Sequence, residues 1–489
     1  MNSGIFEQNP TSTRKGIPMN TTPPPLPAPA TGILPPSWRS GFTPKLLFIG
    51  ALALLLLIPL FMVRSLLSER RGRQMEAVDG ITKAWSGDQT LIGPVLVIPY
   101  RVPVTVRRNE RSGNTVTPVE ETTWTTSHAC FLPSRIEVAG TLHPDRLHRG
   151  IYEAVVYRAD LKVSGAFDPP DMNEWKIEPE NILWNEAAIL LSISDPRGIT
   201  DALSLQLGGA SLPMTPGVRL ASFGSPLRTR VPADAFAGRA PVPFELDLSL
   251  NGSGNFLVAP VGMQTRMALD SSWADPCFHG AFLPLQREVT PEGFRASWEA
   301  SYYGRAFPQS WTDADTADAA TALTRHAFGV VLATPVDGYR LVERAIKYGV
   351  LFIVLLFAGF FLFETLAHLN IHPLQYLLIG AAICLFYLAL LSFSELLPFG
   401  RAYLAAAAAA TVLIVGYSAA VLGSRRRAAF IALELALIYG FLYVTLQLQD
   451  YALVLGTAGL FVMLAVVMFA TRRINACGAS QSGDADPEP

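Results

Sequence analysis

The sequence predicts an α-helical membrane bundle of six spans, one followed by five, with a large extracytoplasmic, mainly β, sandwich-like domain between spans 1 and 2. Five long apolar segments lie between residues 348 and 470, with only four to eight residues between neighbouring segments. A sixth apolar segment covers residues 46–63. The sequence between these regions alternates apolar with polar residues, as half-buried strands do.

Composition agrees with a membrane protein and excludes several other classes. Half of the 489 residues are hydrophobic and only 16% are charged. The net charge of −2 gives no electrostatic footprint for nucleic acid, so we expect no nucleic-acid partner. Four cysteines are too few for a disulfide-rich scaffold or a thiolate metal site.

The chain divides into five segments. Prolines dominate the start of the chain, which has little apolar sequence that can form a core. The apolar segment after it is followed by Arg64 rather than by a small-residue cleavage site, which favours an uncleaved signal anchor. The predicted segments are a disordered Pro-rich cytoplasmic tail (1–44), a transmembrane signal-anchor helix (45–63), an extracytoplasmic β-rich domain (64–347), a five-helix transmembrane domain (348–471) and a cytoplasmic tail (472–489).

Within the outer domain, the apolar period changes along the chain. Met75, Val78, Ile81 and Trp85 recur at three to four residues and predict a short amphipathic helix leaving the bilayer. Beyond it, strict alternation predicts antiparallel strands in a sandwich or barrel-like domain from about residue 90 to 310. The alternating segments are 102–106, which precedes a turn at 109–114, and then 155–163, 244–250 and 294–302. Residues 312–327, rich in Asp and Ala, predict one helix.

Arginines in the short loops predict the orientation, because Lys and Arg concentrate in cytoplasmic loops. The loops at 394–401 and 447–450 hold one Arg, one Glu and one Asp. Arg425, Arg426, Arg427, Arg472 and Arg473 lie on the other side and are predicted to be cytoplasmic. Both termini are then inside and residues 64–347 are periplasmic. Basic residues that flank the long outer domain oppose this assignment, but long domains translocate largely regardless of charge.

Ionisable residues within membrane spans are costly and therefore call for a functional hypothesis. One possibility is a proton relay or metal site of Glu364, His368 and His372; the other is a helix-end cluster that hydrogen-bonds a tight turn. Glu434 is the deepest acid, and Glu395 and Arg401 are predicted to pair at the outer face. The polar residues assigned to this group are Glu364, His368, His372, Gln375, Glu395, Arg401 and Glu434.

The outer domain contains no common catalytic motif, and we expect no catalytic residue, cofactor or bound metal. His143, Asp145 and His148 have the residue types of a metal site, although a solvated turn is the alternative. Cys130 and Cys277 are either free or bridged. The tryptophans of the domain are interpreted mainly as core residues, with stacking on glycan rings as the alternative.

A set of collinear motifs resembles the CreD family of bacterial inner-membrane proteins. The resemblance covers about residues 65–475. It implies a protein of cell-envelope integrity or colicin tolerance, associated with an envelope-stress regulon, and no nameable enzymatic activity. The motifs are Trp85–Tyr100, Arg149–Tyr157, Phe282–Glu288, Arg305–Trp311, Phe328–Tyr339, Arg344–Tyr348, Phe361–Glu364, Ile371–Tyr376 and Gln449–Ala452.

We therefore expect a non-enzymatic inner-membrane protein that supports envelope integrity, with the lipid bilayer and an envelope protein or cell-wall component as partners. A transport or mechanotransmission component of a larger complex is the alternative, and an enzyme acting on lipid-linked glycans is a third possibility. The candidate functional surface is the junction between domain and membrane, where basic residues and tyrosines meet headgroups, or else form a structural collar. Its residues are Asp337, Tyr339, Arg340, Arg344, Lys347 and Tyr348.

Overall fold

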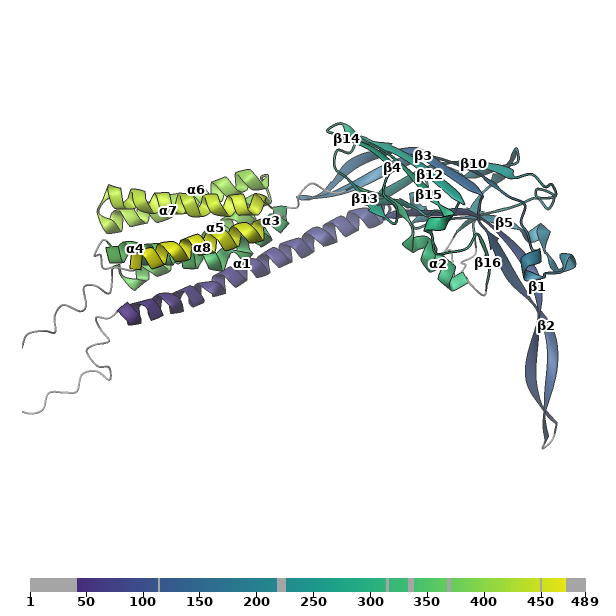
Figure 1. The fold of residues 1–489 in the computed structure, drawn as a ribbon, viewed down its shortest axis with the longest axis horizontal. Coiled ribbons are helices and arrows are strands. Elements are labelled where there is room, and N and C mark those ends of the chain that lie inside the picture. The colour runs from purple at the N-terminus through teal and green to yellow at the C-terminus, as the bar shows by residue number, and fades with distance from the viewer. Residues whose placement is uncertain are drawn as a thin grey trace, which may run out of the picture.

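The protein is elongated, with a helical bundle at one end and a β domain at the other (Figure 1). The computed structural model describes residues 42–112, 115–217, 226–313, 316–332, 338–366, 371–448 and 451–471. Nearly all of the two predicted tails lies outside these ranges. The helices are α1 (Phe42–Trp85), α2 (Thr316–Arg325), α3 (Gly338–Lys347), α4 (Gly349–Leu366), α5 (Pro373–Ser394), α6 (Phe399–Leu422), α7 (Arg425–Gln447) and α8 (Ala452–Thr471).

Helix α1 runs without a break from the bundle to the β domain (Figure 1). The separate short helix predicted at residues 75–85 is therefore wrong, because the apolar segment continues into it as one helix of 44 residues. At 1.5 Å per residue this helix is about 66 Å long, whereas the hydrocarbon core of a bilayer is about 30 Å thick. Roughly half of α1 therefore lies outside the bilayer. Its bundle-facing side chains are Ile49, Leu52, Leu56, Leu60, Val63 and Leu67.

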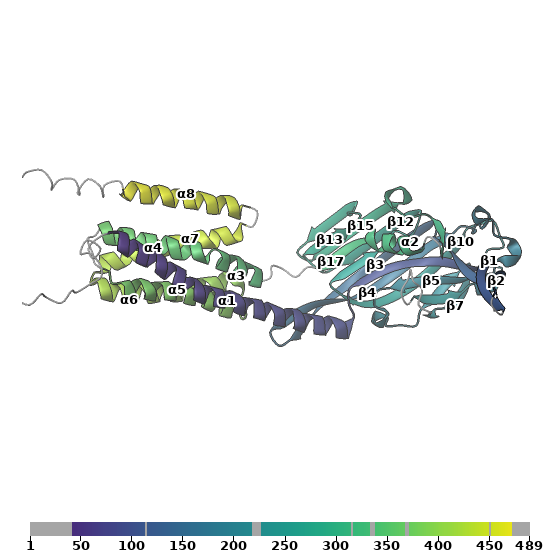
Figure 2. The same cartoon turned by 90° about the horizontal axis from the view of Figure 1, so that it is seen from below.

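The C-terminal helices form the rest of the bundle. Over the described residues, four helices are long and apolar enough to cross a membrane, including α1, and a fifth is counted if the bent pair α3 and α4 forms one span. The bend between α3 and α4 is 47°. Helix α8 is also apolar, and it lies at the edge of the bundle, against α4 and α7 (Figure 2). The prediction of a membrane bundle is confirmed in this form, while the exact number of six spans stays a prediction.

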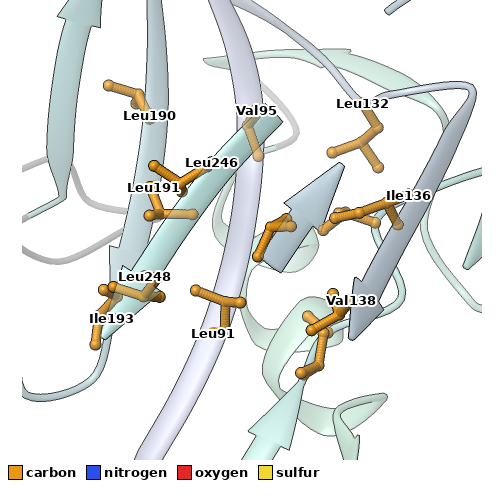
Figure 3. Close-up of a cluster of buried hydrophobic side chains, with 14 of the residues drawn as sticks. Leu91, Val95, Leu132, Ile136, Val138, Leu190, Leu191, Ile193, Leu246 and Leu248 are labelled. Carbon is orange, nitrogen blue, oxygen red and sulfur yellow. The ribbon is translucent and has the colours of Figure 1, made fainter. Parts of the chain in front are cut away.

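The β domain consists of two sheets around one core. The first has nine strands, with the path β13-β17-β11-β1-β5-β9-β8, to which β2 and β16 are attached. The second has eight strands in the order β14-β15-β12-β3-β4-β10-β6-β7. Leu91 and Val95 of the first sheet face Leu246 and Leu248 of the second in a shared apolar layer (Figure 3). The sandwich-like arrangement thus follows from alternation on the inner faces of both sheets.

The strands of the first sheet are β1 (Gln89–Ser112), β2 (Thr115–Phe131), β5 (Ala188–Ile193), β8 (Thr215–Pro216), β9 (Leu227–Arg230), β11 (Asn255–Val258), β13 (Pro276–Gly280), β16 (Ser310–Thr312) and β17 (Phe328–Leu332). Those of the second are β3 (Arg135–Arg149), β4 (Tyr152–Phe167), β6 (Ser204–Leu207), β7 (Ala210–Pro213), β10 (Val242–Ser253), β12 (Gln264–Ser271), β14 (Gln286–Thr290) and β15 (Gly293–Ser301). The sheets are not purely antiparallel, since β1 pairs with β11, and β3 with β12, in parallel.

Two further predictions need correction. The alternating segment at 102–106 is half-buried only at Val102, because β1 and β2 continue beyond the domain as a projecting hairpin arm, residues 101–112 and 115–127 (Figure 1). Val104 and Val106 are exposed there, and so is Trp124. Residues 143–148 are not a turn either, because they pair with β4 near the end of the long β3–β4 hairpin.

Candidate functional site at the membrane junction

The end of the β3–β4 hairpin, α1, α3 and the end of α5 meet where the β domain adjoins the bundle. Tyr339 on α3 is buried and donates a hydrogen bond to Glu395 after α5, with 3.4 Å between the oxygens. Arg70 of α1 pairs with the same carboxylate at 3.6 Å. The predicted partner of Glu395, Arg401, is replaced by Arg70 because α1 runs beside this corner. Tyr152 at the start of β4 packs against the bundle core.

A second carboxylate links α1 and α3. Glu343 accepts a hydrogen bond from Arg71 at 3.0 Å and pairs with Lys347, one turn further along α3, at 3.1 Å. These groups are partly exposed, so each pair contributes only modestly to stability. Among the other predicted junction residues, Arg340 is exposed, Arg344 is half-buried, Tyr348 packs on the bundle core and Asp337 lies outside the described residues.

A cavity of about 960 Å³ lies between these elements. Its walls come from α1, the β3–β4 hairpin, the end of β17 and the corner of Tyr339 and Glu395. The lining carries both signs of charge, including Arg71, Arg146, Asp79 and Glu395. The junction therefore places charged side chains around an open cavity next to the apolar bundle.

The far end of α1 is fixed to the β domain by a buried amide that sequence reasoning did not single out. Gln89, at the start of β1, is fully buried, and its Nε2 donates to the carbonyls of Asn251 (2.9 Å) and Asp195 (3.0 Å). Its Oε1 accepts from the backbone N–H of Asp195 at 3.2 Å. In the sequence, this glutamine could have been found from its place in the motif at residues 85–100. We call Ser86, Gly87, Gln89, Asp195 and Asn251 the α1 joint.

A carboxylate completes the α1 joint. Asp195 accepts from the backbone N–H of Gly87 at 3.1 Å and from Arg197 Nη2 at 2.6 Å. The hydrogen bond from Arg197 is the main reason that the pKa of Asp195 lies well below its ordinary value. Ser253 of β10 donates to the carbonyl of Ser86 at 2.7 Å. Both sheets therefore hold the end of the helix.

Glu364 is held at the opposite end of the bundle. It is buried and accepts hydrogen bonds from Tyr376 Oη at 2.8 Å and from the backbone N–H of Ile371 at 2.9 Å, and it pairs with Lys45 of α1. A buried carboxylate with one cation and two further donors is well satisfied. These contacts tie α1, α4 and α5 together.

The neighbouring polar residues cap a helix. His372 Nδ1 accepts from the backbone N–H of Leu374 at 3.3 Å, and Gln375 Oε1 accepts from the backbone N–H of His372 at 3.3 Å. This reciprocal arrangement is a capping box at the start of α5. His368 lies outside the described residues, so the structure does not describe the predicted relay of Glu364, His368 and His372.

Glu434 has a different environment from the other acids of the bundle. Its Oε2 atom is buried and has no hydrogen-bond partner among the described residues. The carboxyl group lies over Gly359 of α4, where a Cβ atom would come within 1.7 Å of Oε1. Only glycine therefore leaves room for this side chain between α4 and α7.

Three consecutive arginines, which we call the arginine cluster, lie at the end of the bundle away from the β domain. Arg425, Arg426 and Arg427 begin α7, and α1 also begins at this end (Figure 1). Arg472 and Arg473 lie outside the described residues. The arginine cluster and the β domain thus occupy opposite ends of the helices.

The remaining polar residues of the β domain hold the fold. Buried Arg305 donates to the carbonyls of Pro260 and Val261, each at 2.9 Å, and pairs with Gln309. Burial lowers the pKa of Arg305 to about 10. His143 lies 3.4 Å from Asp160 and His148 lies 3.6 Å from Glu153, on separate rungs of the β3–β4 hairpin. No group of three or more His, Cys, Asp or Glu in the described ranges is placed to hold a metal.

The structure also places the cysteines and tryptophans of the β domain. Cys130 is buried and Cys277 is exposed, and both are free thiols. Trp298, in the alternating segment 294–302, and Trp311 are fully buried core residues, which agrees with the interpretation of the tryptophans as mainly core residues. Trp124 on the hairpin arm and Trp85 at the end of α1 are exposed.

Comparison with known proteins identifies the family. The profile of the family described as inner membrane protein CreD matches residues 42–477. Inner membrane protein CreD of Escherichia coli (strain K12) is 33% identical over 432 residues, which are 88% of this chain and 93% of that protein. This chain therefore belongs to the CreD family and is a multi-pass inner-membrane protein.

Proposed function

We propose that this protein supports cell-envelope integrity as a non-enzymatic link between the inner membrane and a periplasmic partner. The observation that carries the proposal is helix α1, which is continuous from the bundle to the β domain and is fixed at both ends. Glu364 and Lys45 hold its start, and the α1 joint holds its end. A force or displacement on the β domain is thereby transmitted to the bundle along one rigid element.

The junction supplies a second connection. Glu395 contacts Arg70 of α1 and Tyr339 of α3. Glu343, one helical turn after Tyr339 on α3, contacts Arg71 of α1 and Lys347 of α3. Attachment through a helix and a separate junction restricts rotation of the β domain about α1. Arg344, Lys347 and Tyr348 lie next to this contact, where they can meet lipid headgroups.

The proposal places the β domain in the periplasm and both termini in the cytoplasm, with six spans. The arginine cluster at the opposite end of the bundle supports this orientation. An alkaline phosphatase fusion after residue 250 tests it. We expect an active fusion, and a stable but inactive one contradicts the assignment.

The hairpin arm is the proposed contact surface for an extended segment of an envelope protein. Strand β16 pairs with Ala129–Phe131 of β2, and Asp313 then accepts the N–H of His128 at 2.8 Å. The N–H and C=O groups of successive residues in a strand point to opposite edges. The same open edge that His128 faces is therefore faced by the N–H groups of Glu120, Thr122, Trp124 and Thr126.

The other edge of the arm is less suited to pairing. Pro103 lies opposite Trp124 in the β1–β2 register and has no N–H to donate. A partner strand is thus expected to extend the edge that β16 begins, by β-augmentation. A photo-crosslinking amino acid at Thr122 should capture a periplasmic protein in cells, whereas the same group at exposed Tyr303 serves as the control. Equal capture at both positions contradicts the assignment.

The continuous helix also favours a second candidate function, a mechanotransmission or transport component of a larger complex. Copurification of an ATPase, or substrate flux in vesicles that is lost in Glu364→Gln or Glu434→Gln, supports this alternative. If the protein instead acts as a non-enzymatic link, a deletion strain should be sensitive to detergents, and no catalytic partner is required. A deletion strain with unchanged resistance to detergents and drugs counts against it.

A further inference from the structure

Helices α4, α7 and α8 line a partly open cavity of about 590 Å³. Apolar side chains form its walls, including Phe352, Leu355, Phe430 and Phe441. Glu434 is the only residue with a polar side chain among the described residues that line it. A volume of this size is typical of sites for small molecules.

The position of Glu434 makes this cavity chemically unusual. It is the tenth residue of α7, about 14 Å along the helix from Arg425 and therefore deep in the span. Among the described residues, no cation pairs with a charged carboxylate here, and its buried Oε2 atom has no hydrogen-bond partner in either protonation state. Either state carries a desolvation cost that a hydrogen-bonding ligand relieves.

The surrounding helices preserve the cavity. Gly359 leaves space for the carboxyl group, and the stacked rings of Phe363 and Phe430, with centroids 5.2 Å apart, close the side toward the arginine end. Helix α8, at the edge of the bundle, forms the outer wall (Figure 2). A molecule dissolved in the bilayer therefore has a short path to Glu434 past α8.

We propose that this cavity binds a membrane-soluble amphiphile, an apolar chain whose polar end is a hydroxyl or amino group that donates to Glu434. The apolar walls take the chain, and the carboxyl group fixes the polar end. This ligand class goes beyond the proposed link function, which depends on α1 and not on this cavity.

Photolabelling of the purified full-length protein tests the inference. The probes are a diazirine-bearing long-chain alcohol, the matching primary amine and the matching methyl ether, which has no donor. Labelling by the alcohol and the amine should exceed that by the ether roughly tenfold, as expected for a hydrogen bond to a charged group. The labelled peptides should come from α4, α7 or α8.

Variants separate the site from general lipid contact. Glu434→Leu should remove the preference for donor-bearing probes, and Glu434→Gln should keep the alcohol while losing the amine. Ala458→Phe fills the cavity and should reduce labelling by all three probes. Ser418→Ala, a buried position on α6 outside the cavity, is the folded control and should label like the wild type. Equal labelling by all probes, or unchanged labelling in Glu434→Leu, overturns the inference.

Discussion

Gln89 donates a hydrogen bond to the carbonyl of Asn251 at 2.9 Å, only four residues after α1 ends at Trp85. This contact joins the end of a long helix to the sandwich, because Asn251 lies near the end of β10 in the second sheet and Gln89 begins a strand of the first. Together with the hydrogen bonds of Gly87 to Asp195 and of Ser253 to Ser86, it fixes the end of α1 to the β domain.

Replacing Gln89 with Ala should destabilise the β domain. The change removes the partner of three backbone groups, and each buried group left unsatisfied costs about 1–3 kcal/mol, so we expect a loss of at least about 3 kcal/mol in the free energy of unfolding. Denaturant unfolding followed by tryptophan fluorescence measures this. Gln206→Ala, at an exposed glutamine on β6, should change little, and an equal loss in both variants contradicts the role of Gln89.

The α1 joint should weaken in acid. The pKa of Asp195 is lowered in the folded protein, chiefly by Arg197, so its contribution is present above the unfolded pKa of about 4 and is lost as the pH falls below it. Unfolding of the wild type should therefore become easier as the pH falls from about 4. Asp195→Asn should be less stable at neutral pH and should lose less stability on acidification. An identical pH dependence in both proteins opposes this account.

Glu364 should stabilise the bundle. Glu364→Leu leaves the Tyr376 hydroxyl and the Ile371 N–H buried without an acceptor, and we expect a loss of about 3–5 kcal/mol. Thermal unfolding in detergent measures the effect, with exposed Glu69→Gln as the control. Wild-type thermal stability in Glu364→Leu contradicts a structural role for this acid.

The basic residues of the junction should matter in cells. Replacing Arg344 and Lys347 together by Ala removes one of the two partners of Glu343 and two positive charges next to the bilayer. Detergent resistance should fall while the protein level stays constant. The matched control is Arg287→Ala on exposed β14, outside the junction. Full resistance in the junction variant removes the case for this surface.

The native cysteines test the orientation. Exposed Cys277 should react with a membrane-impermeant maleimide added to intact spheroplasts. Cys130 should stay unmodified, because burial is the main cause that raises the pKa of its thiol to about 12. Labelling of Cys277 only after the membrane is opened would place the β domain in the cytoplasm.

The periodicity of apolar residues predicted helices and strands but missed contacts between residues far apart in the sequence. Apolar segments identified the helices, and alternation identified strands such as β4, β10 and β15 with their buried inner faces. The same alternation misplaced Val104 and Val106, because a two-stranded arm has the pattern of a core strand but nothing to pack against. The pairing of Glu395 with Arg70 was also missed, since the two residues are 325 positions apart in the sequence.

Insertion of four glycines between Glu76 and Ala77, in the part of α1 outside the bilayer, tests the central claim most directly. The insertion interrupts the helix but leaves the α1 joint and the bundle intact, and the same insertion between Gly238 and Arg239, in the exposed bend at 237–240, is the control. In a deletion strain, we expect the control to restore detergent resistance and the α1 insertion to fail at equal protein level. Full restoration by the α1 insertion would contradict the role of α1 as a rigid link.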